Sequence, residues 1–259
     1  MRLGVHIATW SLGAFSALAA AAADPSPGDL VRGLDAQETK LEWKLPHKKI
    51  GVPAETATRK CQVFSGYAVL ASDEGEMGVA DLEIRVRPEG MKAKEVCGAA
   101  FRGRSIRPTG RAAGNYPVGV VGRFLFSVYP DADGILQGFT LLDLERGELS
   151  YEDAYEYERE LRFERAGDGP VMTYWAPLDG FDCVPRHGQA TCWTRIREKL
   201  GLPVTVPQPD CERAIAKEPS MLQGEPDRSA QIAVHVRVRR LSRRDATYLP
   251  DPPICAAAP

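Results

Sequence analysis

Short apolar runs separated by turn-forming residues make up the chain from Cys61 onward. Glycine, aspartate and proline interrupt these runs, and none of the long runs keeps the spacing of an amphipathic helix. Short apolar runs bounded by turn residues are typical of strands in antiparallel sheets. The pattern predicts strands at 61–72, 79–87, 118–128, 138–144, 148–157, 161–166, 170–178 and 231–241.

Two blocks of this region resemble each other, Gly66–Gly90 and Gly122–Gly147. Each contains a glycine, an apolar strand, an acidic loop with glycine, an alternating strand and a charged turn that ends in glycine. The glycines recur at a nearly constant offset, which indicates a degenerate duplication of one hairpin. The alternative interpretation is that two unrelated hairpins share the same turn chemistry.

A helical insert is predicted near residues 191–217. Trp193, Ile196 and Leu200 recur at helical spacing, and the chain returns to an alternating strand afterwards. Cap and stop residues are also present. They are Thr191 at the start, Gly201 and Pro203 at the end, and Asp210 for one further turn.

The expected fold is therefore mainly β, with antiparallel hairpins forming a sandwich, an open barrel or propeller-like sheets, and with the short helical insert. We expect residues 1–23 to be a signal peptide and residues 24–60, rich in proline and charge, to be an N-terminal tether and lead-in. Residues 61–259 are expected to form a single disulfide-bonded β domain.

The first residues have the features of an export signal. Arg2 precedes an alanine-rich apolar run, and Ala21-Ala22-Ala23 satisfies the A-x-A cleavage rule, so Asp24 is the expected mature N-terminus. The run is weakly hydrophobic compared with the roughly 20 strongly apolar residues of a spanning helix, which makes an uncleaved anchor the lesser alternative. We expect a periplasmic or secreted protein with no integral membrane segment after cleavage.

The charge balance of the mature chain argues against nucleic acid as a partner. The full chain has 33 basic and 35 acidic residues, and the signal contains one basic residue and no acidic one, so the mature net charge is −3. A nearly neutral surface exerts no long-range attraction on nucleic acid or on anionic lipid.

Six cysteines follow the signal, and an oxidising compartment would join them in three disulfides. Six cysteines allow 15 pairings, so the sequence leaves most of the connectivity open. Cys61 and Cys97 flank one predicted β unit far from the other cysteines, which favours a bond between them. The cysteines are Cys61, Cys97, Cys183, Cys192, Cys211 and Cys255.

The loop with Asp131, Asp133 and Gly134 is a candidate cation site. An EF-hand loop requires oxygen ligands at positions 1, 3 and 5, a glycine at 6 and a glutamate at 12, and this loop fails at the last three of these positions. Aspartate and glycine are also the residues of a tight bend. We therefore expect a hairpin turn, with no metal and no cofactor.

Tyrosines alternate with carboxylates in Tyr151–Leu161. This segment could line a sugar-binding face or supply an acid/base pair, but two carboxyls on one strand do not by themselves converge across a cleft. The favoured interpretation is a strand with Tyr155 and Tyr157 packed inward and its glutamates in water.

Arginines alternate with valines in Val234–Arg244. This strand could form a phosphate or nucleic-acid surface, or an edge protected by charge. Pairing with the acidic tyrosine strand, across or between sheets, is a further possibility. Structural roles are favoured because the whole chain is slightly acidic.

Established catalytic and metal motifs are missing from the sequence. Cys183, His187 and Cys192 have ligand-like spacing but lack a fourth ligand, and exported thiols usually oxidise. The chain contains no G-x-S-x-G elbow, phosphate loop, dinucleotide fingerprint or H-E-x-x-H. We expect no catalytic residues, although a site can be assembled without a motif.

The order of several motifs resembles a group of exported proteins of Gram-negative bacteria that has no assigned activity. These motifs are Cys61 with "SGY", then Cys97, a strand pair around "DLERGE", a Tyr-Trp strand followed by Cys183, and a basic strand followed by Cys255. The resemblance implies bonds Cys61–Cys97 and Cys183–Cys255. The insert then leaves Cys192 to bond Cys211.

The leading functional hypothesis is an exported, non-catalytic binding protein or envelope accessory factor, with an unknown ligand or envelope component as partner. The alternative is a hydrolase acting on envelope polysaccharide or peptide through carboxylates, which would be found among Asp131, Asp133, Glu156 and Glu158. A secreted cation-binding module is a third possibility.

Overall fold

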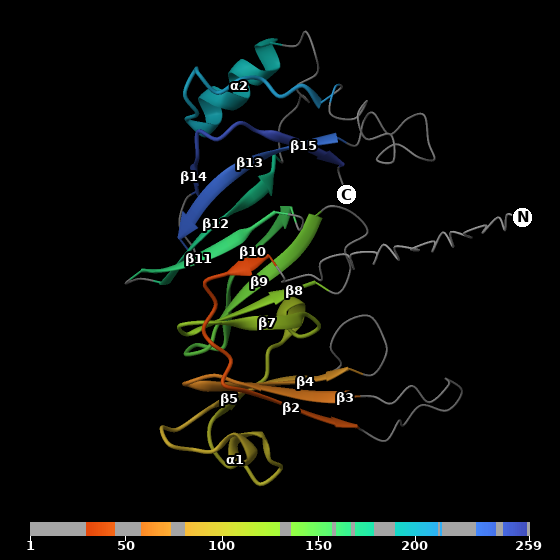
Figure 1. Ribbon diagram of the computed structural model, residues 1–259, viewed down its shortest axis with the longest axis vertical. Helices are drawn as coiled ribbons and strands as arrows, with labels where there is room; N and C mark the ends of the chain where they lie inside the picture. The colour runs from red at the N-terminus through yellow and green to blue at the C-terminus, as the bar shows by residue number, and fades with distance from the viewer. Residues whose placement is uncertain are drawn as a thin grey trace, which may run out of the picture.

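The computed structural model is mainly β and consists of antiparallel sheets stacked in three layers (Figure 1). It describes residues 30–44, 58–73, 81–129, 136–156, 159–166, 169–178, 190–211, 213, 232–241 and 246–257. In this part of the chain each sheet is open. We call the sheets lower, middle and upper, following their order in Figure 1.

The lower sheet has the strand order β2-β3-β4-β5-β6. A short helix, α1 (Ala93–Cys97), lies between β5 and β6 in the chain and below the sheet in Figure 1. The strands are β2 (Thr39–Lys44), β3 (Thr58–Val63), β4 (Tyr67–Asp73), β5 (Asp81–Val86) and β6 (Ser105–Ile106).

The middle sheet has the order β10-β9-β8-β7, and a 3-10 helix at Gly110–Ala112 precedes it. Because every strand is followed by its neighbour in the sheet, the middle sheet is a simple meander. The strands are β7 (Tyr116–Val121), β8 (Phe124–Val128), β9 (Leu136–Asp143) and β10 (Glu148–Glu156).

The upper sheet has the order β1-β11-β12-β13-β14, with β15 also paired to β13. Its first pair, β1 with β11, is parallel. Helix α2 (Ala190–Leu200) lies between β12 and β13 in the chain. The strands are β1 (Val31–Arg32), β11 (Leu161–Ala166), β12 (Gly169–Pro177), β13 (Ile232–Leu241), β14 (Ala246–Tyr248) and β15 (Ile254–Ala257).

Apolar side chains from facing strands fill the spaces between the layers. Leu82 and Ile84 of β5 belong to the core that the lower sheet shares with the middle sheet. Phe139 and Leu141 of β9 belong to the core between the middle and upper sheets. The two similar hairpins of the sequence therefore lie in successive layers, and the corresponding residues of each face the next sheet of the stack.

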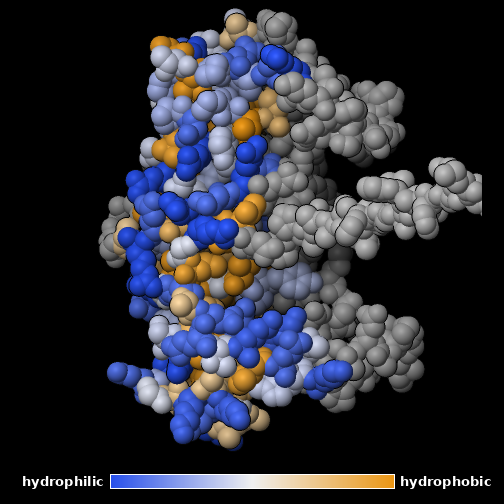
Figure 2. All heavy atoms as spheres, viewed as in Figure 1, coloured by the Kyte–Doolittle hydropathy of each residue, from blue (hydrophilic) through white to orange (hydrophobic). Residues whose placement is uncertain are grey.

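Two neighbours, the middle sheet and helix α2, cover one apolar face of the upper sheet. At one end of this face, Tyr174 and Val238 pack on the middle sheet. At the other end, Val234 and Val236 pack on α2, together with its buried Trp193. On the side of the molecule drawn in Figure 2, an apolar patch reaches the surface midway along the stack, with hydrophilic residues above and below it.

Residues Leu30–Lys44, which we call the strap, correct the expectation of a loosely packed lead-in. The strap runs past all three layers (Figure 1), because β1 pairs with β11 of the upper sheet and β2 pairs with β3 of the lower sheet. Between them, the Asp35 N–H donates to the Val120 carbonyl of the middle sheet at 2.7 Å. The strap was missed because its strands are short or mostly polar, and their pairings are distant in sequence.

Asp35 is the point at which the strap is anchored to the middle and upper sheets. Its Oδ2 accepts a hydrogen bond from the Gly122 N–H at 3.0 Å, and its Oδ1 pairs with Arg165. Replacing Asp35 with alanine is expected to lower the free energy of unfolding by about 2 kcal/mol, because a charge-assisted bond to a backbone N–H is lost. Urea unfolding measures the change. Arg165 is exposed, so Arg165→Ala should lower the free energy of unfolding less than Asp35→Ala. A larger loss in Arg165→Ala would contradict the role of Asp35 as the anchor of the strap.

Helix α2 confirms the predicted insert and shifts its start. The helix begins at Ala190, so Thr191 lies inside it and is not its cap. Gly201 ends it with φ +66°, a conformation that favours glycine. Asp210 has the predicted capping role, because its Oδ1 accepts the Arg213 N–H at 3.0 Å.

The disulfides confirm one expected pairing and overturn the other two. Cys61 is bonded to Cys97, but Cys211 is bonded to Cys255, which contradicts the pairs Cys183–Cys255 and Cys192–Cys211. Cys192 is also disulfide-bonded, and Cys183 lies outside the described residues. The expectation failed because the insert folds onto the upper sheet, where Cys211 meets β15, the strand that contains Cys255.

Alkaline pH is expected to destabilise the protein through its buried tyrosines. Burial raises the pKa of the Tyr155 hydroxyl to about 12. Because the unfolded chain loses this proton near pH 10, the stabilisation is complete below that pH and is lost as the pH rises toward 12. In a Tyr155→Phe variant, the free energy of unfolding should fall less steeply between about pH 10 and 12.

Part of the loss of stability at alkaline pH will remain in Tyr155→Phe, because burial also raises the pKa of Tyr151 and Tyr174. The measurement is urea unfolding at several pH values, read by far-ultraviolet circular dichroism. An unchanged slope in the variant would mean that Tyr155 does not contribute.

Candidate functional site

The outer face of the lower sheet, the face turned away from the middle sheet, presents a row of one aromatic and three polar side chains. Trp43 lies opposite Arg59, Arg59 opposite Ser72, and Ser72 opposite Asp81 in the registers of the paired strands. Directly opposite residues project from the same face of a sheet. We call these four residues the Trp43 row.

Helix α1 covers the neighbouring part of this face and leaves the Trp43 row partly open. Cys61 and Leu70, in the adjacent row, pack against Val96 and Cys97 of α1. The Trp43 side chain, in contrast, is 39% exposed. Asp81 is about half exposed and Arg59 is partly exposed. The face therefore has a covered end under α1 and an accessible end at the Trp43 row.

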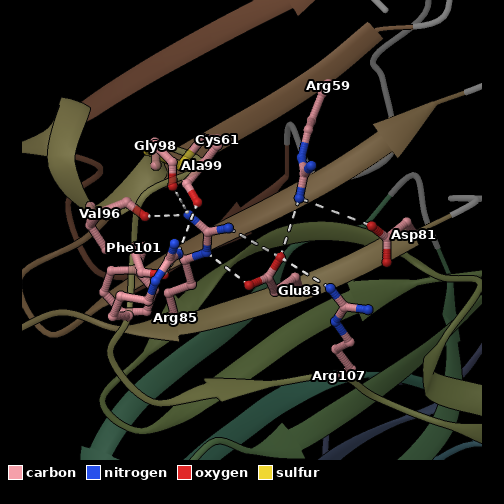
Figure 3. A network of polar contacts seen from close by, with 12 residues as sticks. Arg59, Cys61, Asp81, Glu83, Arg85, Val96, Gly98, Ala99, Phe101 and Arg107 are labelled. Atoms are coloured by element: carbon pink, nitrogen blue, oxygen red, sulfur yellow. Dashed lines mark hydrogen bonds and ion pairs between the residues drawn. A yellow bond between two sulfur atoms is a disulfide. The ribbon is translucent and has the colours of Figure 1, made fainter.

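Glu83 lies beside the Trp43 row and is surrounded by arginines (Figure 3). Its side chain is only 7% exposed, and Arg85 Nε donates to its Oε1 at 2.8 Å. Arg59 Nη2 donates to Glu83 Oε2 at 3.2 Å. Arg107 Nη2 approaches the same oxygen at 3.8 Å. Three guanidinium groups from different segments of the chain thus converge on one carboxylate.

The arginines keep Glu83 ionised. The hydrogen bond from Arg85 is the main cause that lowers the pKa of the Glu83 carboxyl, and the positive charges of Arg85, Arg107 and Arg59 lower it further. Burial acts in the opposite direction but does not prevail. The carboxylate therefore stays charged under ordinary conditions.

Arg85 also ties the lower sheet to the end of α1. Its Nη1 donates to the carbonyls of Val96 and Gly98, both at 2.7 Å, and its guanidinium lies 5.1 Å from the centre of the Phe101 ring. Figure 3 shows these contacts on one side of Arg85 and the Glu83 contacts on the other. Arg85 is thus a structural residue, and the more accessible cations near the Trp43 row are Arg59 and Arg107.

A second polar cluster connects the middle and upper sheets. Asp153 of β10 accepts hydrogen bonds from Tyr151 at 2.5 Å and from Tyr174 at 2.6 Å. Arg240 of β13 lies 3.8 Å from the same carboxylate and 5.0 Å from the centre of the Tyr151 ring. The acidic tyrosine strand and the basic strand therefore pair between sheets, one of the possibilities that their sequences raised.

The other arginines of the basic strand also have acidic partners. Arg239 donates to Glu164 at 2.9 Å, and Arg237 lies 3.5 Å from Asp251. The valines between them are buried in the cores described above. These ion pairs support a structural role for the described part of Val234–Arg244, which ends at Leu241.

The turn in "DLERGE" is also held by a carboxylate. Asp143 is buried, and its Oδ1 accepts the backbone N–H groups of Glu145 at 3.0 Å and Arg146 at 3.4 Å. Arg123 lies 3.4 Å from its other oxygen. Asp143 therefore shapes the turn between β9 and β10.

The residues considered from sequence do not assemble into one site. Asp131, Asp133, Gly134, Tyr157 and Glu158 lie outside the described residues, as do Cys183 and His187. Tyr155 is buried as expected, but Glu156 is also buried, at 2% exposure, and is not in water. Across the part of the chain that the structure describes, no group of three His, Cys, Asp or Glu side chains could hold a metal ion.

The sequence interpretation missed the arginine cluster. A signal was present, because Glu83 and Arg85 alternate with Leu82 and Ile84 and must share one face of a strand. Arg59 reaches that face because β3 pairs with β4 and β4 pairs with β5. Arg107 reaches it because it directly follows β6, which pairs with β5. Strand alternation does not specify these pairings.

Comparison with known proteins identified no relative of this chain. No family model matches the chain. No curated protein and no solved structure gives a significant match. No helix among the described residues has the length and apolar composition to cross a membrane.

Proposed function

We propose that the protein is an exported, non-catalytic binding protein of the cell envelope, and that it binds an envelope polysaccharide on the Trp43 row. The observation that favours this function most is the row itself, an accessible indole aligned with Arg59 and Asp81 on the part of the sheet face that α1 leaves open. An aromatic ring can pack on the apolar face of a sugar, while the charged groups bond its hydroxyls.

The proposed location rests on two features. The N-terminal pattern of residues 1–23 is that of a cleaved export signal. The bonds Cys61–Cys97 and Cys211–Cys255 are of the kind that persists in oxidising compartments. Fractionation of the native host with mass spectrometry of the N-terminus tests this part, and we expect a periplasmic or secreted protein that begins at Asp24.

A non-catalytic role is supported by the positions of the acidic side chains. Glu83 is held by arginines, Asp143 by turn amides and Asp153 by two tyrosines. Glu156, one of the carboxylates considered for a hydrolase, is buried. Each of these groups has a place in the architecture, which favours binding; the other carboxylates considered for a hydrolase, Asp131, Asp133 and Glu158, lie outside the described residues.

Binding is tested with the mature protein, because the described strands run from Val31 of β1 to Ala257 of β15 and all three sheets belong to one stack. Soluble peptidoglycan fragments and purified bacterial exopolysaccharides are titrated in a calorimeter. We expect at least one of them to bind, and replacing Trp43 with alanine should weaken that affinity by about tenfold or more, the typical loss at an aromatic contact residue. Failure of every polysaccharide to bind would refute the proposal.

Leu149→Ala is the matched control for Trp43→Ala. Leu149 is 38% exposed, compared with 39% for Trp43, but it lies on β10 of the middle sheet. Its replacement should leave the affinity unchanged. Equal losses in both variants would show that the Trp43 row is not the binding surface.

A further inference from the structure

We infer that the ligand is an acidic glycan and that Arg107, together with Arg59, binds its carboxylate groups on the sheet face that also presents Trp43. This inference rests on the proposed function, because it specifies the chemistry of the polysaccharide bound on the same face. It starts from the imbalance of charge around Glu83. Three guanidinium groups meet two carboxylates there, Glu83 and Asp81, which leaves an excess of one positive charge.

Arg85 is not suited to bind a ligand, because its side chain is only 9% exposed and most of its donors are already used. Its Nε and Nη2 donate to the two oxygens of Glu83, and its Nη1 donates to two backbone carbonyls. A guanidinium has five N–H donors, and four contacts engage three of its nitrogens. Binding a ligand through Arg85 would break the connection between β5 and α1.

Arg107 differs from Arg85 in being exposed and in lying farther from Glu83. Its Nη2 is 3.8 Å from Glu83 Oε2, which is beyond hydrogen-bond distance, and its side chain is 69% exposed. Glu83 attracts the guanidinium to the edge of the Trp43 row without using its planar pair of donors. A free guanidinium edge is suited to a carboxylate, which it can bind through two parallel hydrogen bonds.

Arg59 extends this cationic surface toward the aromatic ring. It lies opposite Trp43 in the register of β2 and β3, and its Nη2 contacts Glu83 at 3.2 Å and Asp81 at 4.0 Å. Arg59 and Arg107 are like charges held near one carboxylate, and an anionic ligand would relieve the repulsion between them. The positive end of the face therefore adjoins its aromatic end.

The spacing of the sheet indicates a ligand longer than one sugar. Trp43 is on β2, and Arg107 reaches Glu83 on β5, three strands away. Neighbouring strands are about 4.8 Å apart, so β2 and β5 are separated by about 14 Å, and Trp43 and Glu83 by at least that distance. A single sugar cannot contact both. We therefore expect affinity for an oligosaccharide whose acidic unit lies some distance from the unit that stacks on Trp43.

The test compares acidic oligosaccharides with their neutral forms. Oligogalacturonate, oligoalginate and hyaluronate fragments are titrated against the mature protein, in parallel with the same oligosaccharides after chemical reduction of their carboxyl groups. We expect at least one acidic oligosaccharide to bind about tenfold or more tightly than its neutral form, since the lost interaction is a charge-assisted hydrogen bond. Its affinity should also fall as salt is added.

Variants assign the effect to residues. Arg107→Ala should remove most of the preference for the acidic form, and Arg107→Lys should restore only part of it, because lysine lacks the two-pronged donor edge. Arg162→Ala is the control, since this arginine is 58% exposed but lies on β11 of the upper sheet. Its replacement should change nothing.

The outcomes separate this inference from the proposed function. Equal binding of acidic and neutral forms, with no effect of Arg107→Ala, would overturn the acidic-glycan inference and leave polysaccharide binding standing. Binding of a phosphorylated polysaccharide alone would overturn the choice of carboxylate. If no oligosaccharide and no polysaccharide bound, both the inference and the proposed function would be refuted.

Discussion

Replacing Glu83 with alanine should destabilise the protein by about 3 to 5 kcal/mol, the usual cost of removing one partner of a buried ion pair. The Glu83 and Arg85 side chains are 7% and 9% exposed, so the variant leaves a buried guanidinium without its carboxylate. Arg59 and Arg107 would then repel Arg85 without compensation. The free energy of unfolding in urea, measured at neutral pH, gives the effect.

Acid pH should reduce the difference between the wild type and this variant. The pKa of Glu83 is lowered in the folded protein, so its stabilisation is fully present above the unfolded pKa of about 4.3 and is lost as the pH falls through the lower folded value. Stability measured at about pH 7, 5 and 3 follows this change. The wild type should lose more stability than Glu83→Ala over this range.

Glu145→Ala is the matched control. Glu145 forms an ion pair with Arg123 at 2.9 Å, but both side chains are exposed to solvent. An exposed pair contributes less than about 1 kcal/mol. If the two variants lost similar stability, Glu83 would not be the buried centre of the network.

Removing the Cys61–Cys97 bond is expected to have an effect of similar size. The bond closes a loop of 36 residues, for which the loss of chain entropy in the unfolded state predicts about 4 kcal/mol. The double variant Cys61→Ala, Cys97→Ala avoids placing free thiols or hydroxyls in the core under α1. Guanidinium unfolding should show a lower midpoint, and amide exchange should rise first in α1 and β3.

The double variant Cys211→Ala, Cys255→Ala provides the comparison. Its bond closes a loop of 44 residues, so the total loss should be close to that of the first variant. The faster amide exchange, however, should appear at β15 and at the α2 end of the stack. Faster exchange at the same end of the molecule in both variants would be inconsistent with the layered arrangement.

Strands β5, β9, β10, β11, β12 and β13 could be predicted because their signal is local. The segments predicted as single strands at 61–72 and 118–128 are instead pairs of antiparallel strands, β3 with β4 and β7 with β8, because the chain turns back at residues 64–66 and again at Gly122. Within β5, Leu82 and Ile84 alternate with Glu83 and Arg85, and this period identifies both a strand and its two faces. Helix α2 was predicted for a similar reason, from Trp193 and Ile196 at helical spacing. Where a segment was missed, as in β1 and β2, it was too short or too polar to stand out from a loop.

The candidate site could be predicted only in part. Alternation alone places Glu83 and Arg85 on one face, but it does not reveal that Arg59 and Arg107 join them, because those contacts cross 24 residues in each direction. The Cys211–Cys255 bond has the same origin, since it depends on how the insert folds onto the upper sheet. Such contacts follow from strand pairing and not from spacing.

By itself, the sequence determined that the chain is mainly β and where several of its strands and the helical insert lie, and it favoured the bond between Cys61 and Cys97. These properties follow from side-chain periodicity, turn residues and proximity along the chain. Only the tertiary structure decided the stacking of three sheets, the path of the strap along them, and the convergence of Arg59 and Arg107 on Glu83 beside the Trp43 row. Those features depend on which strand pairs with which and on which faces pack together, and burial of the whole apolar surface selects that arrangement.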